Sequence, residues 1–285
     1  MDAKRIVWLA SYPKSGNTWV RLLLGNLLGL SDDDEDEDFV PVAGISSSRG
    51  VFDHLAGLNT YHLTDDEVDS LRPAVYRSLV DASDQLRFIK AHDAFRRLPD
   101  GDAIFPGDCS HGAIYIVRDP LDVAVSFSHH QGHQTFDKTV AGMNDPTKSI
   151  AGGNREQLRQ IMFDWSGHYR SWIGQTEMPV CLVRYEDLRA DTVAELTRIV
   201  GFVGLDEATF ANSIEGAVEA SRFERLQEIE DKRGFSERPE KAERFFRAGR
   251  SGEGRERLPE NLQKELIAHH ADVMRELGYL QGERQ

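Results

Sequence analysis

Three basic side chains follow apolar, strand-like runs of this sequence and are suited to chemistry on an anionic group. Lys14, His92 and Arg118 each come within four residues of the end of such a run. Lysine and arginine bind phosphate or sulfate oxygens through charge and hydrogen bonds, and histidine exchanges a proton near neutral pH. The pattern predicts a site that holds an anion and moves a proton.

The first of these runs leads into a loop that is typical of phosphate binding. Residues Trp8–Trp19 read WLASYPKSGNTW, an apolar strand, a Ser/Gly loop and the start of a helix near Thr18. A helix that begins there directs its positive end and free N–H groups at an anion in the loop. The loop is not a Walker A motif, because Lys14 precedes the only loop glycine, Gly16.

An arginine and a serine after the third run could bind a second phosphate. Arg118 ends the run, Pro120 suits the first turn of a following helix, and Ser126 lies about two turns along it. The alternative is structural: Arg118 pairs with Asp119 or Asp122 and Ser126 is merely packed.

Lys90 and His92 stand two residues apart in FIKAHD, on one side of an extended segment. A histidine at the end of a strand can act as a general base, since its pKa lies near working pH. The alternative is a hydrogen-bonded loop histidine without a catalytic role.

Two further clusters give weaker signals. His129, His130 and His133 include the i, i+4 spacing of a helical metal site, but no carboxylate or cysteine completes it, so no metal is predicted. Residues 245–255 read FFRAGRSGEGR, a Gly-rich basic loop that could approach an anion closely.

The elements that must position these residues are four apolar runs with the character of parallel strands. Each run is followed by a polar break, and helical periodicity resumes after most of them. This alternation predicts an α/β fold with a parallel sheet flanked by helices and with ligands at the carboxyl ends of the strands. Tyr185 follows the fourth run, and an amphipathic helix with Pro259 in its first turn closes the chain. The predicted strands are Arg5–Ala10, Leu86–Lys90, Ala113–Val117 and Val180–Arg184, and the closing helix is Leu258–Leu277.

Composition limits the classes of function. The 285 residues are 40% hydrophobic, and we predict one domain over 1–285. The net charge of −14 argues against nucleic acid as a partner, and half of it comes from the acidic run 32–38, predicted as a solvated loop within 31–38. The polar intervals 39–85 and 131–175 suit lids and an acceptor pocket.

Location and redox state follow from what the sequence lacks. It has no apolar stretch of the length that a membrane span needs and no signal peptide, so neither a membrane partner nor export is predicted. The two cysteines, Cys109 and Cys181, are expected in the core of a cytoplasmic protein. The sequence does not predict an oligomeric state.

Taken together, these segments resemble the soluble sulfotransferase family, in particular its bacterial members, which use 3′-phosphoadenosine 5′-phosphosulfate (PAPS) and release 3′,5′-bisphosphoadenosine (PAP). The family's SYPKSGTTW-like loop stands here as SYPKSGNTW, with Asn17 in place of a threonine, and VRDPLDVAVS matches a second family motif. The C-terminal pattern R-K-G-x-x-G-D-W-K-N is only partly kept. The resemblance implies the P-loop-like sulfotransferase fold.

The resemblance also implies roles for individual residues. Lys14 would contact the 5′-phosphate and the bridging oxygen, Lys90 would assist at the sulfuryl group, and His92 would be the base. Further donor contacts would come from Ser15, Gly16, Asn17 and Thr18 in the loop, Trp19, Tyr185, Ser221 and Phe223 at adenine, and Arg118, Ser126, Arg247, Ala248 and Gly249 at the 3′-phosphate.

The function implied is in-line transfer of the sulfuryl group to a hydroxyl of a small molecule, glycoside or natural product, without a metal. Positioned cations and a base meet the needs of such a displacement. Two alternatives remain open: a nucleotide-dependent small-molecule kinase of P-loop ancestry, and a nucleotide-binding protein without catalysis. The missing G-x-x-x-x-G-K-[ST] counts against the first, and the presence of Lys90 and His92 against the second.

Overall fold

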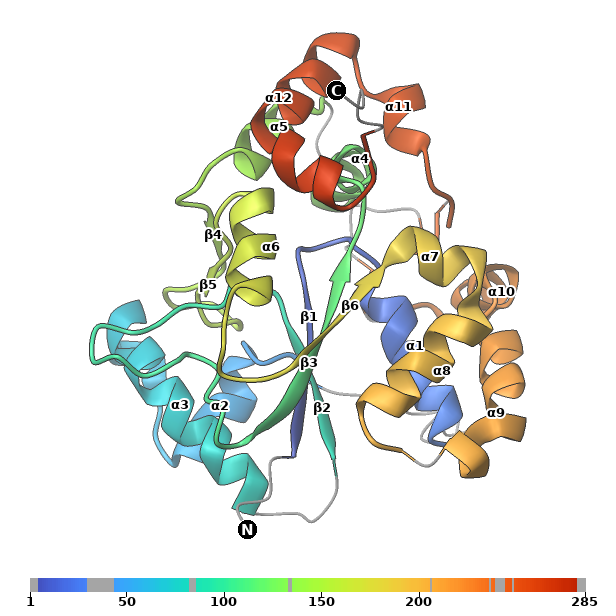
Figure 1. Cartoon of the computed structure of the whole chain (residues 1–285). Helices are drawn as coiled ribbons and strands as arrows, with labels where there is room; N and C mark the ends of the chain where they lie inside the picture. The colour runs from blue at the N-terminus through green and yellow to red at the C-terminus, as the bar shows by residue number, and fades with distance from the viewer. Residues whose placement is uncertain are drawn as a thin grey trace.

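Four parallel strands form the central sheet of the protein, in a computed structural model that describes residues 5–29, 44–81, 86–132, 135–205, 207–235, 237–238, 244–247 and 249–280. The strand order is β2-β1-β3-β6, and helices lie on either side of the sheet (Figure 1), so the predicted α/β architecture is confirmed. The strands are β1 (Ile6–Ser11), β2 (Arg87–Ala91), β3 (Ser110–Val117) and β6 (Val180–Arg184).

All four predicted strands are present, and three of them are shifted at one or both ends. The largest shift is in β3, which begins three residues before the predicted Ala113. The added residues are not apolar, but Ser110 is buried and its hydroxyl accepts a hydrogen bond of 2.7 Å from the Trp8 indole. This long-range bond satisfies a polar group that local hydropathy places outside a strand.

The sheet has a hydrophobic core on each face, because successive side chains of a strand point to opposite sides. In β1, Ile6, Trp8 and Ala10 belong to one core, and Val7 and Leu9 belong to the other. Helices α4, α6 and α12 contribute side chains to the first core, and α1, α8 and α9 contribute to the second. In Figure 1 the three helices of the second core lie together on one side of the sheet. Burial on both faces explains why the strands read as continuous apolar runs.

The helices that cover the sheet begin and end as follows. The first core includes side chains of α4 (Pro120–Gln131), α5 (Asp137–Met143), α6 (Trp165–Ile173) and α12 (Glu260–Glu276). The second core includes side chains of α1 (Asn17–Leu27), α7 (Tyr185–Ala190), α8 (Thr192–Phe202) and α9 (Glu207–Ala220).

The remaining elements are α2 (Arg49–Ala56), the 3₁₀ turn η1 (Thr60–His62), α3 (Asp65–Asp81), the short antiparallel pair β4 (Ser149–Ile150) and β5 (Gln160–Ile161), α10 (Phe223–Arg233) and α11 (Glu253–Arg257). Among them, α3 contributes Tyr76 to the first core.

Two helix starts test the predictions made from proline. Pro120 occupies the first turn of α4 as predicted, after an Asp119 N-cap whose side chain accepts from the Leu121 N–H. Pro259 is the N-cap of α12, so its prediction inside the first turn is wrong by one position. Both prolines suit these places, because the first turn of a helix leaves its N–H groups without intrahelical acceptors.

The predicted lid segments contain buried structure. Helix α6, within 131–175, packs Trp165, His168, Tyr169 and Trp172 into the interior, three of them in the first core. At least this part of the interval is therefore core rather than lid. The acidic run 32–38 and residues 39–43, 82–85 and 133–134 lie outside the described residues.

Cys109 and Cys181 are both buried free thiols, as predicted. None of the helices in the described part of the chain has both the length and the apolar character needed to cross a membrane.

Candidate functional site

A cavity of about 1100 Å³ opens beyond the carboxyl ends of β1, β2 and β3 and contains most of the predicted site residues. Ser15 and Ser221 are buried and do not line it, and Ala248 lies outside the described residues. The predicted residues in its wall are Lys14, Gly16, Asn17, Thr18, Trp19, Lys90, His92, Arg118, Ser126, Tyr185, Phe223, Arg247 and Gly249.

The loop between β1 and α1 takes a conformation that few residues adopt. Lys14 has φ 69° and Gly16 has φ 107° at the N-cap of α1. A Cβ on Gly16 would lie 2.6 Å from a ring carbon of Tyr185, so glycine is needed for space as well as for φ. The strained backbone at Lys14 turns the loop so that the N-terminus of α1 faces the cavity.

Two side chains of this loop point into the protein. The Asn17 amide donates to the Leu9 carbonyl at 2.7 Å and to the Ser11 hydroxyl at 3.2 Å. Asn17 therefore ties the loop to β1, and its backbone N–H in the first helical turn is the group left for an anion. The Ser15 hydroxyl is buried without a hydrogen-bond partner among the described residues.

The surroundings of Lys14 lower the pKa of its side chain. Its Nζ is 3.4 Å from Nδ1 of His130 and 4.1 Å from the ring centre of Phe245. Burial, and then the positive charges of Lys90 and Arg118, lower the pKa of Lys14 to about 7, against an opposing effect of Glu237. A bound anion would reverse this balance.

A glutamate that the sequence did not indicate sits among the cations of the cavity. Glu237 accepts from Thr18 Oγ1 at 3.1 Å, from Lys90 Nζ at 3.3 Å and from Arg21. These positive partners lower the pKa of Glu237 to about 2 against the effect of burial, so it is ionised at neutral pH. Its carboxylate thus occupies a place suited to an oxyanion. A single glutamate in a charged stretch carries no local signal of such a role.

His92 presents a defined tautomer to the cavity. Its Nδ1 lies 2.9 Å from the backbone carbonyl of Ser11, which can only accept, so Nδ1 carries the hydrogen. Nε2 is then the ring nitrogen able to accept a proton. Burial and the neighbouring Lys90 lower the pKa of His92 to about 3, which keeps the imidazole neutral.

Arg118 makes the structural pairing that the sequence left open and also lines the cavity. Its Nη2 is 3.6 Å from the Asp122 carboxylate, the structural pairing considered above, and donates to the Arg250 carbonyl at 2.9 Å. The same guanidinium lies 4.4 Å from the ring centre of Tyr185 and lines the cavity together with Ser126. Arg118 is therefore both anchored and available at the cavity wall.

The aromatic residues predicted at adenine form one side of the cavity. The ring centres of Trp19 and Tyr185 are 5.8 Å apart, and the Trp19 indole donates to the Ser221 carbonyl at 3.0 Å. Ser221 is thus behind Trp19 and positions it, rather than lining the cavity. A Cβ on Gly249 would lie 2.3 Å from the ring of Phe223, which requires glycine there.

The Gly-rich loop is held against α4 by a carboxylate. Asp122 accepts from the N–H groups of Gly252 at 2.9 Å and Gly254 at 2.7 Å. Arg247 pairs with Glu253 at the mouth of the cavity, which lowers the pKa of Glu253 to about 2 despite its burial. The described part of the chain holds no group of three or more metal-ligating side chains, and His133 lies outside it.

The sequence is similar to those of known sulfotransferases. The model of the sulfotransferase domain family matches residues 4–278. Luciferin sulfotransferase of Photinus pyralis is 25% identical over 77% of this chain, and human sulfotransferase 1E1 is 23% identical over 94%. The chain spans 83% of the human protein but 56% of the luciferin enzyme and 64% of mouse sulfotransferase 4A1.

Solved structures show the same fold. Mouse sulfotransferase SULT7A1 complexed with PAP has a TM-score of 0.60 at 16% identity, over 95% of this chain and 84% of that one. Retinol dehydratase in a complex with retinol and PAP has a TM-score of 0.61 at 20% identity, over 99% of this chain and 84% of that one. With the family model matched over nearly its whole length, the chain belongs to the sulfotransferase domain family.

Proposed function

We propose that this protein transfers the sulfuryl group of PAPS to a hydroxyl of a small molecule. The observation that carries the proposal is the gathering of Lys14, Lys90 and His92 in one cavity, with Arg118 and Arg247 in the same wall. Membership of the sulfotransferase domain family supports it.

The residues of the cavity fit the donor nucleotide. The loop at Lys14 and the N-terminus of α1 suit the 5′-phosphosulfate, and Arg118, Ser126 and Arg247 suit the 3′-phosphate. Trp19, Tyr185 and Phe223 offer rings for adenine. The Ser15 hydroxyl under the loop and the Arg118 Nε have no hydrogen-bond partner within the described part of the chain, and an anion nearby would help to satisfy them.

The reaction is an in-line displacement at sulfur. The acceptor oxygen forms the new S–O bond, and its proton passes to Nε2 of His92. The bond from sulfur to the bridging oxygen breaks, and its electron pair leaves on the 5′-phosphate of PAP. Lys14 stabilises the charge that develops on that oxygen, and Lys90 neutralises the sulfuryl oxygens.

The acceptor is proposed to be a small molecule with an apolar body and one reactive hydroxyl. Ile45, Phe127 and Ile150 line the same cavity as His92. Retinol dehydratase, a structurally similar protein, has been solved both with retinol and with androsterone, two small apolar alcohols. A glycoside or other natural product with an apolar face beside its hydroxyl fits equally. The cytoplasmic location of the protein stays a prediction of the sequence.

Purified protein with ³⁵S-labelled PAPS and a panel of phenols, alcohols and glycosides tests the proposal. We expect label on at least one hydroxyl acceptor, and no transfer from γ-labelled ATP. Calorimetry should show binding of PAP and none of ATP at the same concentration. Phosphoryl transfer from ATP would favour the kinase alternative, and PAP binding without transfer across the panel would favour the non-catalytic one.

Binding of PAP is expected to take up a proton at pH 8. The pKa of about 7 makes Lys14 roughly nine-tenths neutral at pH 8 in the free protein, and the 5′-phosphate raises that pKa in the complex. Both phosphates of PAP are already ionised at this pH, since their second pKa is about 6. Calorimetry in buffers of different ionisation enthalpy measures the uptake. Lys14→Met should abolish it, and equal uptake in that variant would exclude Lys14 as the source.

Glu237→Gln is expected to tighten PAP binding by roughly 3- to 10-fold, because one carboxylate that competes for the same cations loses its charge. The amide keeps the size of the side chain and can still accept from Thr18. Titration calorimetry compares the two proteins at one pH. Glu195→Gln, which removes a carboxylate paired with Arg198 on α8, is the matched control and should change nothing. Weaker binding in Glu237→Gln would mean that the carboxylate orders the site.

A further inference from the structure

The segment that carries His92 is held by one helix at three points. His168 Nε2 lies 3.1 Å from the His92 carbonyl, and the Trp172 indole donates to the Asp93 carbonyl at 2.9 Å. The Phe95 N–H donates to the Ser171 hydroxyl at 3.0 Å. All three side chains come from α6, so this helix fixes the backbone on which His92 stands.

The hydrogen positions in this contact are determined by its partners. The His92 carbonyl can only accept, so His168 carries its hydrogen on Nε2. Nδ1 of His168 then accepts from the Tyr115 hydroxyl at 2.8 Å. On the other side, His92 donates from Nδ1 to the Ser11 carbonyl. The hydrogen bonds thus define one direction, from Tyr115 through His168 to the backbone of His92.

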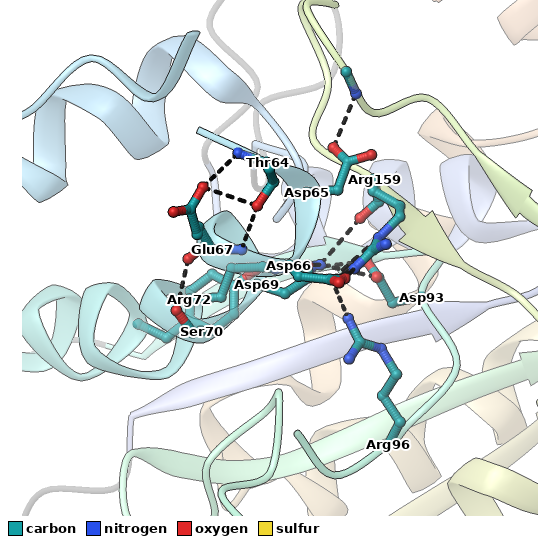
Figure 2. A network of polar contacts seen from close by, with 12 residues as sticks. Thr64, Asp65, Asp66, Glu67, Asp69, Ser70, Arg72, Asp93, Arg96 and Arg159 are labelled. Atoms are coloured by element: carbon teal, nitrogen blue, oxygen red, sulfur yellow. Dashed lines mark hydrogen bonds and ion pairs between the residues drawn. The ribbon is translucent and has the colours of Figure 1, made fainter. Parts of the chain in front are cut away.

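A buried ion pair holds the next residue. Arg72 of α3 donates to both carboxylate oxygens of Asp93, at 2.9 and 2.8 Å, and both side chains are fully buried. Asp69 bonds Arg96 and Arg159 beside this pair (Figure 2). With the Asp93 side chain fixed by α3 and the His92 carbonyl fixed by α6, the peptide after His92 has little freedom to turn.

We propose that His168 is a positioning residue for His92. Its hydrogen bond to the His92 carbonyl holds the His92 ring where Nδ1 donates to the Ser11 carbonyl, so that Nε2 is directed to the acceptor hydroxyl. The inference rests on the proposed role of His92 as the base. His168 itself touches no reacting atom, since its two ring nitrogens bond Tyr115 and the His92 backbone.

The test compares His168→Phe with His168→Gln. Phenylalanine fills the space but cannot donate, and displacement of a base by an ångström is expected to lower kcat by roughly 10- to 100-fold. Glutamine can donate to the His92 carbonyl and accept from Tyr115, so it should recover most of kcat. KM for PAPS and the Kd of PAP should stay within about threefold in both, because no donor contact changes.

His270→Phe is the matched control. His270 is a buried histidine on α12 bonded to the Ser166 hydroxyl at 2.8 Å, and it does not line the cavity. The His270→Phe substitution should lower the thermal stability of the protein without lowering kcat at a temperature where the variant is folded. Equal losses of kcat in His168→Phe and His270→Phe would overturn the positioning role, as would a glutamine variant no better than phenylalanine.

A spectroscopic readout keeps the proposal testable if His168→Phe does not fold. The ¹⁵N shifts of the His92 ring in the unaltered protein should report the Nδ1–H tautomer, and an Nε2–H tautomer would overturn the proposal. If the proposed role of His92 as the base is wrong instead, His92→Ala keeps full turnover. If His92→Ala is inactive while His168→Phe is fully active, only the positioning role is lost.

Discussion

Replacement of His92 by alanine is expected to lower kcat by roughly 10²- to 10⁴-fold, the range that a general base contributes. The ring lies in the cavity wall with Nδ1 bound to the Ser11 carbonyl, which leaves Nε2 to take the acceptor proton. The donor contacts come from other residues, so the Kd of PAP should change by less than about threefold. Transfer of ³⁵S under saturating donor measures kcat, and calorimetry measures PAP binding.

The pH dependence of the same reaction tests the direction in which the pKa of His92 is shifted. A base must be neutral to act, and burial with the nearby Lys90 lowers the pKa of His92 to about 3. The acid limb of kcat/KM should therefore lie below the ordinary histidine pKa of about 6.5. His62→Ala, at an exposed histidine of η1, is the control and should keep full turnover. An acid limb at pH 6.5 or above that vanishes in His92→Ala would contradict the lowered pKa.

Lys14→Met is expected to lower kcat/KM for PAPS by roughly 10²- to 10³-fold, the loss typical of one donor to a developing oxyanion. Methionine keeps most of the stem against Phe245 but has no charge for the leaving 5′-phosphate. The lowered pKa of Lys14, about 7, adds an alkaline limb near that pH to kcat/KM of the unaltered protein, because only the protonated amine can act. Steady-state rates from pH 6 to pH 9 measure both effects.

Lys264→Met controls for loss of a lysine as such. Lys264 forms an exposed i, i+4 pair with Glu260 on α12, a contact worth about 0.3–0.5 kcal/mol, and activity should not change. Were Lys14→Met to retain kcat/KM within threefold, or to keep the alkaline limb, the leaving-group role of Lys14 would be wrong.

The strands of the sheet were predictable because their apolar character is local. β6 is found at the predicted residues, and β1 and β2 differ by one residue at each end. Burial on both faces makes such strands continuous apolar runs, which hydropathy alone detects. The start of β3 was missed, because Ser110 is stabilised by Trp8 from another strand.

The cavity residues were predictable in part. Lys14, Lys90, His92 and Arg118 line one cavity because the carboxyl ends of parallel strands share one edge of the sheet. Two of the predicted residues have supporting side chains: the Asn17 amide bonds back to β1, although Asn17 lines the cavity, and Ser221 lies behind Trp19. Residue type and position cannot distinguish a side chain that faces a ligand from one that supports the wall.

By itself, therefore, the sequence determined the parallel sheet, the Ser/Gly loop after β1 and the basic residues at the strand ends, since each depends on spacing within a few residues. Only the tertiary structure decided which groups surround them. Glu237 lies 147 residues from its partner Lys90, and His168 lies 76 residues from His92. At such separations no periodicity or short motif links two side chains. Their contact is fixed by how α6, α10 and the strands pack around the cavity.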